Sequence, residues 1–184
     1  SNFTSQQEIG FDFNLTVSIP EQNDIVLNGS IIRSDHKFIA SIGERWIKTD
    51  GKTQWVYDPD LGEVQIYDAD EENALPLSPN ELLKSYNTND FSFDIRGRES
   101  VGDDQLVLIE FKPRDKSGQI VKASMQVYQS SALPALMKVS ERDGMQYILE
   151  VENIDTNPSV SPAEFTFDAN KFPEVRIEDL RVTE

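Results

Sequence analysis

Residues 11–19 read Phe-Asp-Phe-Asn-Leu-Thr-Val-Ser-Ile, the most regular alternation in the chain. Every odd position is apolar and every even position is polar, which is the period-two pattern of a strand with one buried face. A helix would instead repeat its apolar positions every three or four residues. Pro20 ends this stretch, and Asn23-Asp24 supplies turn residues before a second β-rich run at 25–33. The sequence therefore predicts a β-hairpin near the N-terminus.

Similar signals continue along most of the chain. Further strands are expected at 37–42, 45–49, 53–58, 63–67, 91–96, 105–112, 119–129, 135–142, 145–154 and 164–168. About a dozen strands joined by short turns such as Asp50-Gly51 are typical of an antiparallel sheet. So many strands do not remain flat, because their accumulated twist curls them toward a barrel. We predict a mainly β fold (α+β by count), namely an incomplete antiparallel β-barrel or strongly curved sheet of about 11–12 strands.

One segment departs from the strand pattern. Ser78-Pro79-Asn80-Glu81 combines an N-cap residue, a proline at the first helical position and an acid three residues after the cap. It predicts a short helix that carries Leu82 and Leu83. No internal repeat or flexible linker divides the chain, so we expect a single domain over residues 1–184.

The composition narrows the classes of function. The chain has 184 residues, 38% of them apolar, which is enough for one hydrophobic core. Its 33 acidic and 17 basic residues give a net charge of −16, which disfavours binding to nucleic acid and to anionic membrane surfaces. No apolar run approaches the length of a membrane span, so we expect no stable membrane insertion.

Signatures of catalysis and of metal binding are weak. The absence of cysteine and the single histidine, His36, exclude zinc-thiolate and multi-histidine sites. His36 lies in the polar run Ser34–Lys37, where a solvated turn is expected. Residues 58–63, Asp-Pro-Asp-Leu-Gly-Glu, are explained by turn chemistry, with calcium binding as the weaker alternative. We therefore expect no enzyme activity, metal or cofactor, and keep a carboxylate enzyme acting on a glycan only as a distant alternative.

Apolar residues recur on one parity of several predicted strands, which indicates a sheet with one dry face. That face is either a packed core or a site for an apolar ligand. Trp46 and Trp55 flank the Asp50-Gly51 turn, where they either anchor a hairpin or line such a site, and the two alternatives have equal weight. The residues that we select from the pattern alone are Phe13, Leu15, Val17, Trp46, Trp55, Tyr57, Met125 and Leu149.

The segment 50–59, Asp-Gly-Lys-Thr-Gln-Trp-Val-Tyr-Asp-Pro, closely resembles the signature strand of the LolA family of periplasmic lipoprotein carriers. The order of the surrounding segments is similar too. A strand containing Phe38 precedes it, and the Leu82-Leu83 helix and an apolar strand ending in Phe111-Lys112-Pro113 follow it. The similarity extends to Phe165-Thr166-Phe167 and covers nearly the whole chain.

The resemblance implies an incomplete β-barrel with a short helical lid over a cavity for acyl chains. It places Phe38 near the cavity mouth, Leu82 or Leu83 in the lid, and Trp55 and Tyr57 in the signature strand. The expected function is to receive lipoproteins from an inner-membrane transporter and to deliver them to an outer-membrane acceptor. The alternative is a periplasmic module that senses lipid or lipoprotein without handing it on. We expect a monomer in the periplasm, with its signal peptide removed.

Two positions depart from the family pattern. The Arg-Pro pair that ties the family's lid to its barrel falls here on Ser34-Asp35-His36, with Arg33 slightly displaced. The N-terminal lid helix is reduced to at most Thr4–Glu8. We therefore expect a different latch, and either a more open cavity or a chain that is truncated at its N-terminus.

Overall fold

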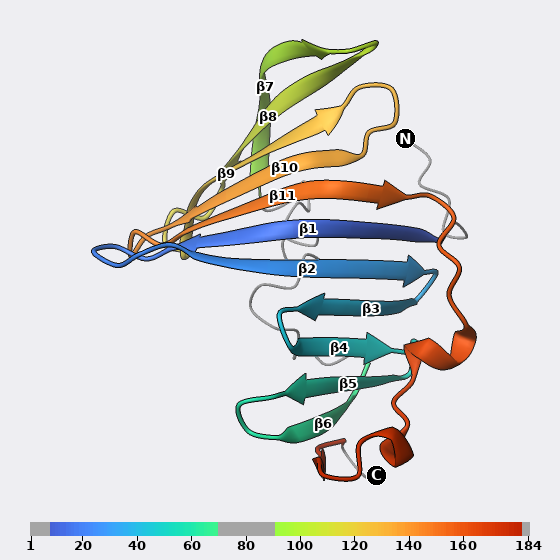
Figure 1. Ribbon diagram of the computed structural model, residues 1–184. Coiled ribbons are helices and arrows are strands. Elements are labelled where there is room, and N and C mark those ends of the chain that lie inside the picture. Colours follow the sequence, from blue (N-terminus) through green and yellow to red (C-terminus); the bar gives the residue numbers. More distant parts are fainter. Residues whose placement is uncertain (1–7, 70–90, 182–184) are drawn as a thin grey trace. The chain divides into compact units, whose positions relative to one another are not determined.

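The computed structural model describes residues 8–69 and 91–181, which are mostly β-strands (Figure 1). The strands are β1 (Ile9–Ser18), β2 (Ile25–Ser34), β3 (Lys37–Ile42), β4 (Arg45–Thr49), β5 (Thr53–Asp58), β6 (Glu63–Asp68), β7 (Phe91–Val101), β8 (Asp104–Pro113), β9 (Ile120–Tyr128), β10 (Pro134–Glu141), β11 (Gln146–Asp155) and β12 (Arg176–Asp179). Two short 3-10 helices, η1 (Pro162–Phe165) and η2 (Ala169–Lys171), lie between β11 and β12. Apart from Glu8, the predicted helices at 4–8 and after Ser78, with Leu82 and Leu83, fall outside the described residues.

The strands form one sheet in the order β12-β6-β5-β4-β3-β2-β1-β11-β10-β9-β8-β7. This linear order confirms the prediction of a mainly β fold with an unclosed sheet of about 12 strands. The short turns between consecutive strands explain the antiparallel pairing, because a strand that reverses through a few residues lies beside the one before it.

Two features differ from the sequence prediction. The prediction of a strand at 164–168 is wrong, because the 3-10 helix η1 (Pro162–Phe165) occupies the first residues of that range. Ser161 caps this helix, Pro162 occupies its first position, and the Glu164 side chain accepts a hydrogen bond from the Ser161 N–H. The second difference is β12, which pairs with β6 in parallel. A parallel partner requires a long connection, and the long path of the chain between β6 and β12 provides one.

The chain divides into two compact units that share β1, β2 and β11. Unit 1 contains the described residues 8–12, 29–69 and 153–181, and unit 2 contains 13–28 and 91–152. The expected single domain over residues 1–184 therefore stays a prediction.

Each unit has its own buried residues. Unit 1 buries Ala40, Ile47, Val64 and Phe165, together with the polar residues Thr49, Gln54 and Glu63. Unit 2 buries Phe13, Leu15, Val17, Phe91, Val107, Ala123, Met125, Met137, Val139, Tyr147 and Leu149. Most of these residues alternate along their strands with more exposed ones, so each unit has an inward-packed sheet face.

Candidate functional site

The strands of unit 2 align apolar side chains into two rows that cross β8 to β11. Because directly paired residues of neighbouring strands project to the same face, the registers define these rows. The first row is Ile109–Met125–Met137–Leu149, and the second is Phe111–Ala123–Val139–Tyr147. We call the face that carries both rows the apolar face of unit 2. Met125 and Leu149, two of the residues selected from the sequence, belong to it.

The three residues selected from β1 belong to the same face. Asn14 donates a hydrogen bond from its side chain to the carboxylate of Glu152, so the even positions of β1 lie with the even positions of β11. The odd positions of β1 then lie with Leu149, and three of them, Phe13, Leu15 and Val17, are buried. The period-two pattern at the start of the sequence thus predicted the correct side of the strand.

The apolar rows continue onto the edge strand β7. Phe93 pairs with Phe111, and Ile95 pairs with Ile109, so both extend the apolar face of unit 2. Phe93 is 58% exposed and Ile95 is 53% exposed, whereas Met125 is only 8% exposed. The face is therefore buried over its central strands and open to solvent along β7. The sequence selection missed Phe93 and Ile95, although their alternation with Ser92 and Asp94 was a usable signal.

The opposite face of unit 2 is polar and ion-paired. Glu110 accepts a hydrogen bond from the guanidinium of Arg96 at 2.8 Å and lies 3.2 Å from the ammonium of Lys122. Lys112 lies 3.1 Å from Asp94 on the same face. Hydrogen bonds, first from Arg96 and then from Lys122, lower the pKa of Glu110. The sheet of unit 2 therefore has one apolar face and one charged face, as expected for a sheet that is dry on one side.

In unit 1 the selected residues lie on opposite faces of the sheet. Phe38 pairs with Thr49 and therefore shares a face with the buried Ile47. Trp46 and Trp55 alternate with these positions and project to the other face. Tyr57 pairs directly with Trp46, as expected of two strands that flank the Asp50-Gly51 turn. The structure therefore does not bring Phe38 together with the aromatic residues of the signature strand.

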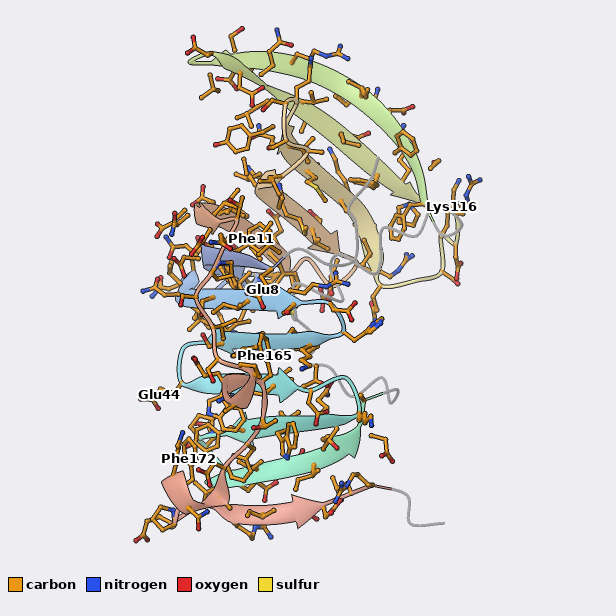
Figure 2. The ribbon with its side chains drawn as sticks, turned by 90° about the vertical axis from the view of Figure 1, so that its right-hand side faces the viewer. Glu8, Phe11, Glu44, Lys116, Phe165 and Phe172 are labelled. Atoms are coloured by element: carbon orange, nitrogen blue, oxygen red, sulfur yellow. The ribbon has the colours of Figure 1, made fainter. Side chains whose placement is uncertain are left out.

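The C-terminal segment of unit 1 covers Trp46 and Tyr57. The rings of Phe167 and Phe172 lie 5.9 Å and 5.8 Å from the ring of Trp46, which stacks on Tyr57 at 5.4 Å. Figure 2 shows the segment with Phe165 and Phe172 passing across the strands of unit 1. These are packing contacts for Trp46, one of the two tryptophans for which the sequence left an anchoring and a lining role open. The sequence analysis missed Phe172 because its partners lie far away in the chain.

A lysine completes this aromatic cluster. The ammonium of Lys48 lies 5.1 Å from the ring centre of Trp46, within the range of a cation–π interaction. Burial, followed by repulsion from Lys171, lowers the pKa of the Lys48 ammonium, whereas the carboxylate of Glu164 raises it. The attraction between Glu164 and Lys48 adds to the aromatic contacts between the C-terminal segment and the sheet of unit 1.

The weak catalytic and metal candidates lie in turns. The side chain of His36 is 84% exposed in the turn between β2 and β3, as predicted. The 58–63 segment is the turn between β5 and β6, where the Asp60 N–H donates to the Asp58 side chain at 2.9 Å. Arg45 lies 2.6 Å from Asp60 and also contacts Asp58, so a cation of the protein already pairs with both carboxylates. Over residues 8–69 and 91–181, no group of three or more potential ligand side chains could hold a metal ion.

No helix within the described parts of the chain has the length and apolar character needed to cross a membrane.

Sequence comparisons identify relatives of the chain. A family described as "Outer membrane lipoprotein carrier protein LolA" matches residues 43–168. An outer-membrane lipoprotein carrier protein from Bordetella avium (strain 197N) is 28% identical over 131 residues, which make up 71% of this chain and 60% of that protein. The chain thus matches only 60% of the length of this curated relative.

Structural comparisons show that the fold recurs in proteins of low sequence identity. An uncharacterized conserved protein from Thermus thermophilus has a TM-score of 0.62 at 7% identity, with 97% of this chain and 91% of that chain covered. MucB has a TM-score of 0.52 at 14% identity, with 95% of this chain and 60% of that chain covered.

Proposed function

The chain belongs to the LolA family of outer-membrane lipoprotein carrier proteins, and we propose that it binds the acyl chains of lipidated proteins and carries them across the periplasm. The relative from Bordetella avium, described as a carrier of the same kind, supports this proposal. The structural observation that carries it is the apolar face of unit 2, which is buried over β9 to β11 and open along β7.

An apolar sheet face of this kind suits an acyl chain. Transfer of a hydrocarbon chain from water to an apolar surface contributes about 0.8 kcal/mol for each buried CH₂ group. A chain that contacts only part of the face still binds with useful affinity, and its exposed end remains accessible along β7. The exposure of Phe93 and Ile95 supports this edge as the place where an acyl chain first meets the protein.

Binding and delivery by this route need no covalent chemistry and no cofactor. The acyl chain passes from an inner-membrane transporter to the carrier and then to an outer-membrane acceptor, each time exchanging one apolar surface for another. The net charge of −16 disfavours adhesion to anionic membranes, so docking depends on partner proteins. We further propose, as the family resemblance implies, that Phe38 and Leu82 or Leu83 take part in ligand binding.

The proposal is tested by titrating the protein with an acyl-chain fluorophore. Phe93 and Ile95 form the exposed rim of the apolar face. Phe93→Glu or Ile95→Glu places a carboxylate at this rim and should weaken saturable binding by about tenfold or more. Val101→Glu is the matched control, because Val101 is 42% exposed on the same strand but pairs with Asp104 at the far end of the β7–β8 hairpin. Its binding should stay within about twofold of wild type. Phe38→Glu should also weaken binding.

Two results would reject the proposal. One is the absence of saturable binding by the wild-type protein. The other is an equal loss of binding in the rim variants and in Val101→Glu, because it would show that charge alone and not the apolar face matters. A transfer assay with an acceptor separates a carrier from a sensor, since only a carrier releases a bound lipopeptide to a second protein.

A further inference from the structure

A β-bulge in β7 changes which side chains face the apolar side of unit 2. Ile95 pairs with Ile109, but the next pair is Gly97 with Leu108, so Arg96 is an extra residue on β7. Without this extra residue, Arg98 would pair with Leu106 on the polar face. With it, Arg98 pairs with Val107, which is buried and lies two residues from Ile109 on the same strand. The bulge thus turns Arg98 onto the apolar face, a known use of bulges.

Arg98 differs from the other cations within strands β7, β8 and β9 in lacking a partner. Arg96, Lys112 and Lys122 each lie within 4 Å of a carboxylate on the polar face. Among the described residues, the guanidinium of Arg98 makes no hydrogen bond or ion pair with any side chain, and the residue is exposed. A chain with a net charge of −16 therefore presents an unpaired cation beside its exposed apolar rim.

We propose that Arg98 and the exposed rim of the apolar face form a binding site for an acyl lipid with an anionic headgroup. The hydrocarbon chain lies against Ile95 and Ile109, and the headgroup, a phosphate or a carboxylate, accepts hydrogen bonds from the guanidinium of Arg98. This inference rests on the proposed function for the acyl-chain contact and adds a preference for headgroup charge. The acyl-modified end of a protein does not require that preference.

The chemistry of the guanidinium supports this assignment. Its planar N–H fork matches two oxygens of a phosphate or a carboxylate, and it stays charged at all physiological pH values. The site is at the edge of the sheet, where the headgroup can remain in water while the chain lies on the face. An exposed cation contributes modestly, and the expected preference is about five- to tenfold in affinity.

The test uses lipids that share one palmitoyl chain and differ in their headgroups, each below its micelle concentration. Monopalmitoylglycerol is neutral, lysophosphatidylcholine is zwitterionic, lysophosphatidylglycerol carries an anionic phosphodiester, and palmitate carries a carboxylate. The anionic lipids should bind about five- to tenfold more tightly than monopalmitoylglycerol, and about 1 M salt should abolish the difference. Comparing lysophosphatidylglycerol with palmitate identifies which anionic group the site prefers.

Arg98→Gln and Arg96→Gln form a matched pair for this test. Both remove one guanidinium from β7, but Arg96 hydrogen-bonds to Glu110 on the polar face. Arg98→Gln should remove the preference for anionic lipids and leave the affinity for monopalmitoylglycerol unchanged, whereas Arg96→Gln should retain the preference. Equal affinities of the wild-type protein for neutral and anionic lipids would overturn the inference alone. The absence of binding to every lipid would instead overturn the proposed function.

Discussion

Replacing Phe165 with alanine tests whether the C-terminal segment is an integral part of unit 1. Phe165 lies in η1, is only 2% exposed, and belongs to a helix that packs against β3. Truncating a fully buried phenylalanine removes its apolar contacts and leaves a cavity, at a cost of roughly 3–4 kcal/mol in the free energy of unfolding. For a chain of this length, that loss corresponds to a fall in melting temperature of about 6–16 °C.

Urea denaturation followed by tryptophan fluorescence measures this loss directly, because both tryptophans, Trp46 and Trp55, are in unit 1. Ile177→Ala is the control, since Ile177 is 45% exposed in β12 and its truncation should cost about 0.5 kcal/mol or less. Limited trypsin digestion adds a local readout, because detachment of the segment would free the backbone around Lys171 and Arg176 for cleavage. A loss below about 1 kcal/mol for Phe165→Ala, with unchanged digestion, would refute the packing described for this segment.

Two further predictions concern a turn and an ion pair. Gly144 has a positive φ, and a Cβ there would lie 2.9 Å from Pro20, so Gly144→Ala should cost roughly 2–3 kcal/mol by urea denaturation. Gly102 also has a positive φ, but a Cβ there would have no neighbour within 4 Å. Gly102→Ala should therefore cost only about 1 kcal/mol. Equal losses of stability in the two variants would contradict the role of the contact with Pro20. Hydrogen bonds from the side chain and then the backbone N–H of Arg181 lower the pKa of Asp179 to about 2, so NMR should show its carboxyl titrating there. Because the folded-state pKa of Asp179 is depressed, its stabilising effect is present above the ordinary pKa of aspartate and is lost as pH falls through about 2. Arg181→Gln should raise the pKa of Asp179. An unchanged pKa would contradict the assignment of the shift to Arg181.

Local patterns in the sequence predicted much of the strand arrangement. The alternation over 11–19 correctly placed Phe13, Leu15 and Val17 on a buried face, because strand parity is a local property. The turn chemistry of residues 58–63 and the exposure of His36 were also predicted correctly. These successes share a cause, since each depends on residues close together in the chain.

The failures arise where distant or subtle contacts decide the structure. The alternation Phe165-Thr166-Phe167 suggested a strand, but the capping residues Ser161 and Glu164 begin a helix there. The parallel pairing of β12 with β6 joins segments far apart in sequence and has no local signature.

The β7 bulge was also missed. Residues 91–98 alternate between apolar and other residues up to Ile95, and the one-residue slip at Arg96 becomes visible only in the pairing with β8. The face to which Arg98 projects therefore depends on that pairing and not on the alternation alone.

The candidate site shows the same limit. Met125 and Leu149 were selected from strand parity, and the registers place them in one row. Phe38 and Trp46 were also selected together, but the pairing of β3 with β4 places them on opposite faces. Strand parity orders residues within one strand, whereas the register between strands determines which residues of different strands share a face.

Photo-crosslinking locates a bound acyl chain and so shows whether it lies on the apolar face of unit 2. A lipopeptide with a photoreactive group near the end of its acyl chain is bound, irradiated, and mapped by mass spectrometry. Binding on this face should give crosslinks at Ile95, Ile109 or Met125, suppressed by excess unlabelled lipopeptide and weakened by Ile95→Glu. Crosslinks at Glu110 or Lys122 on the polar face, or labelling that excess lipopeptide does not suppress, would contradict it.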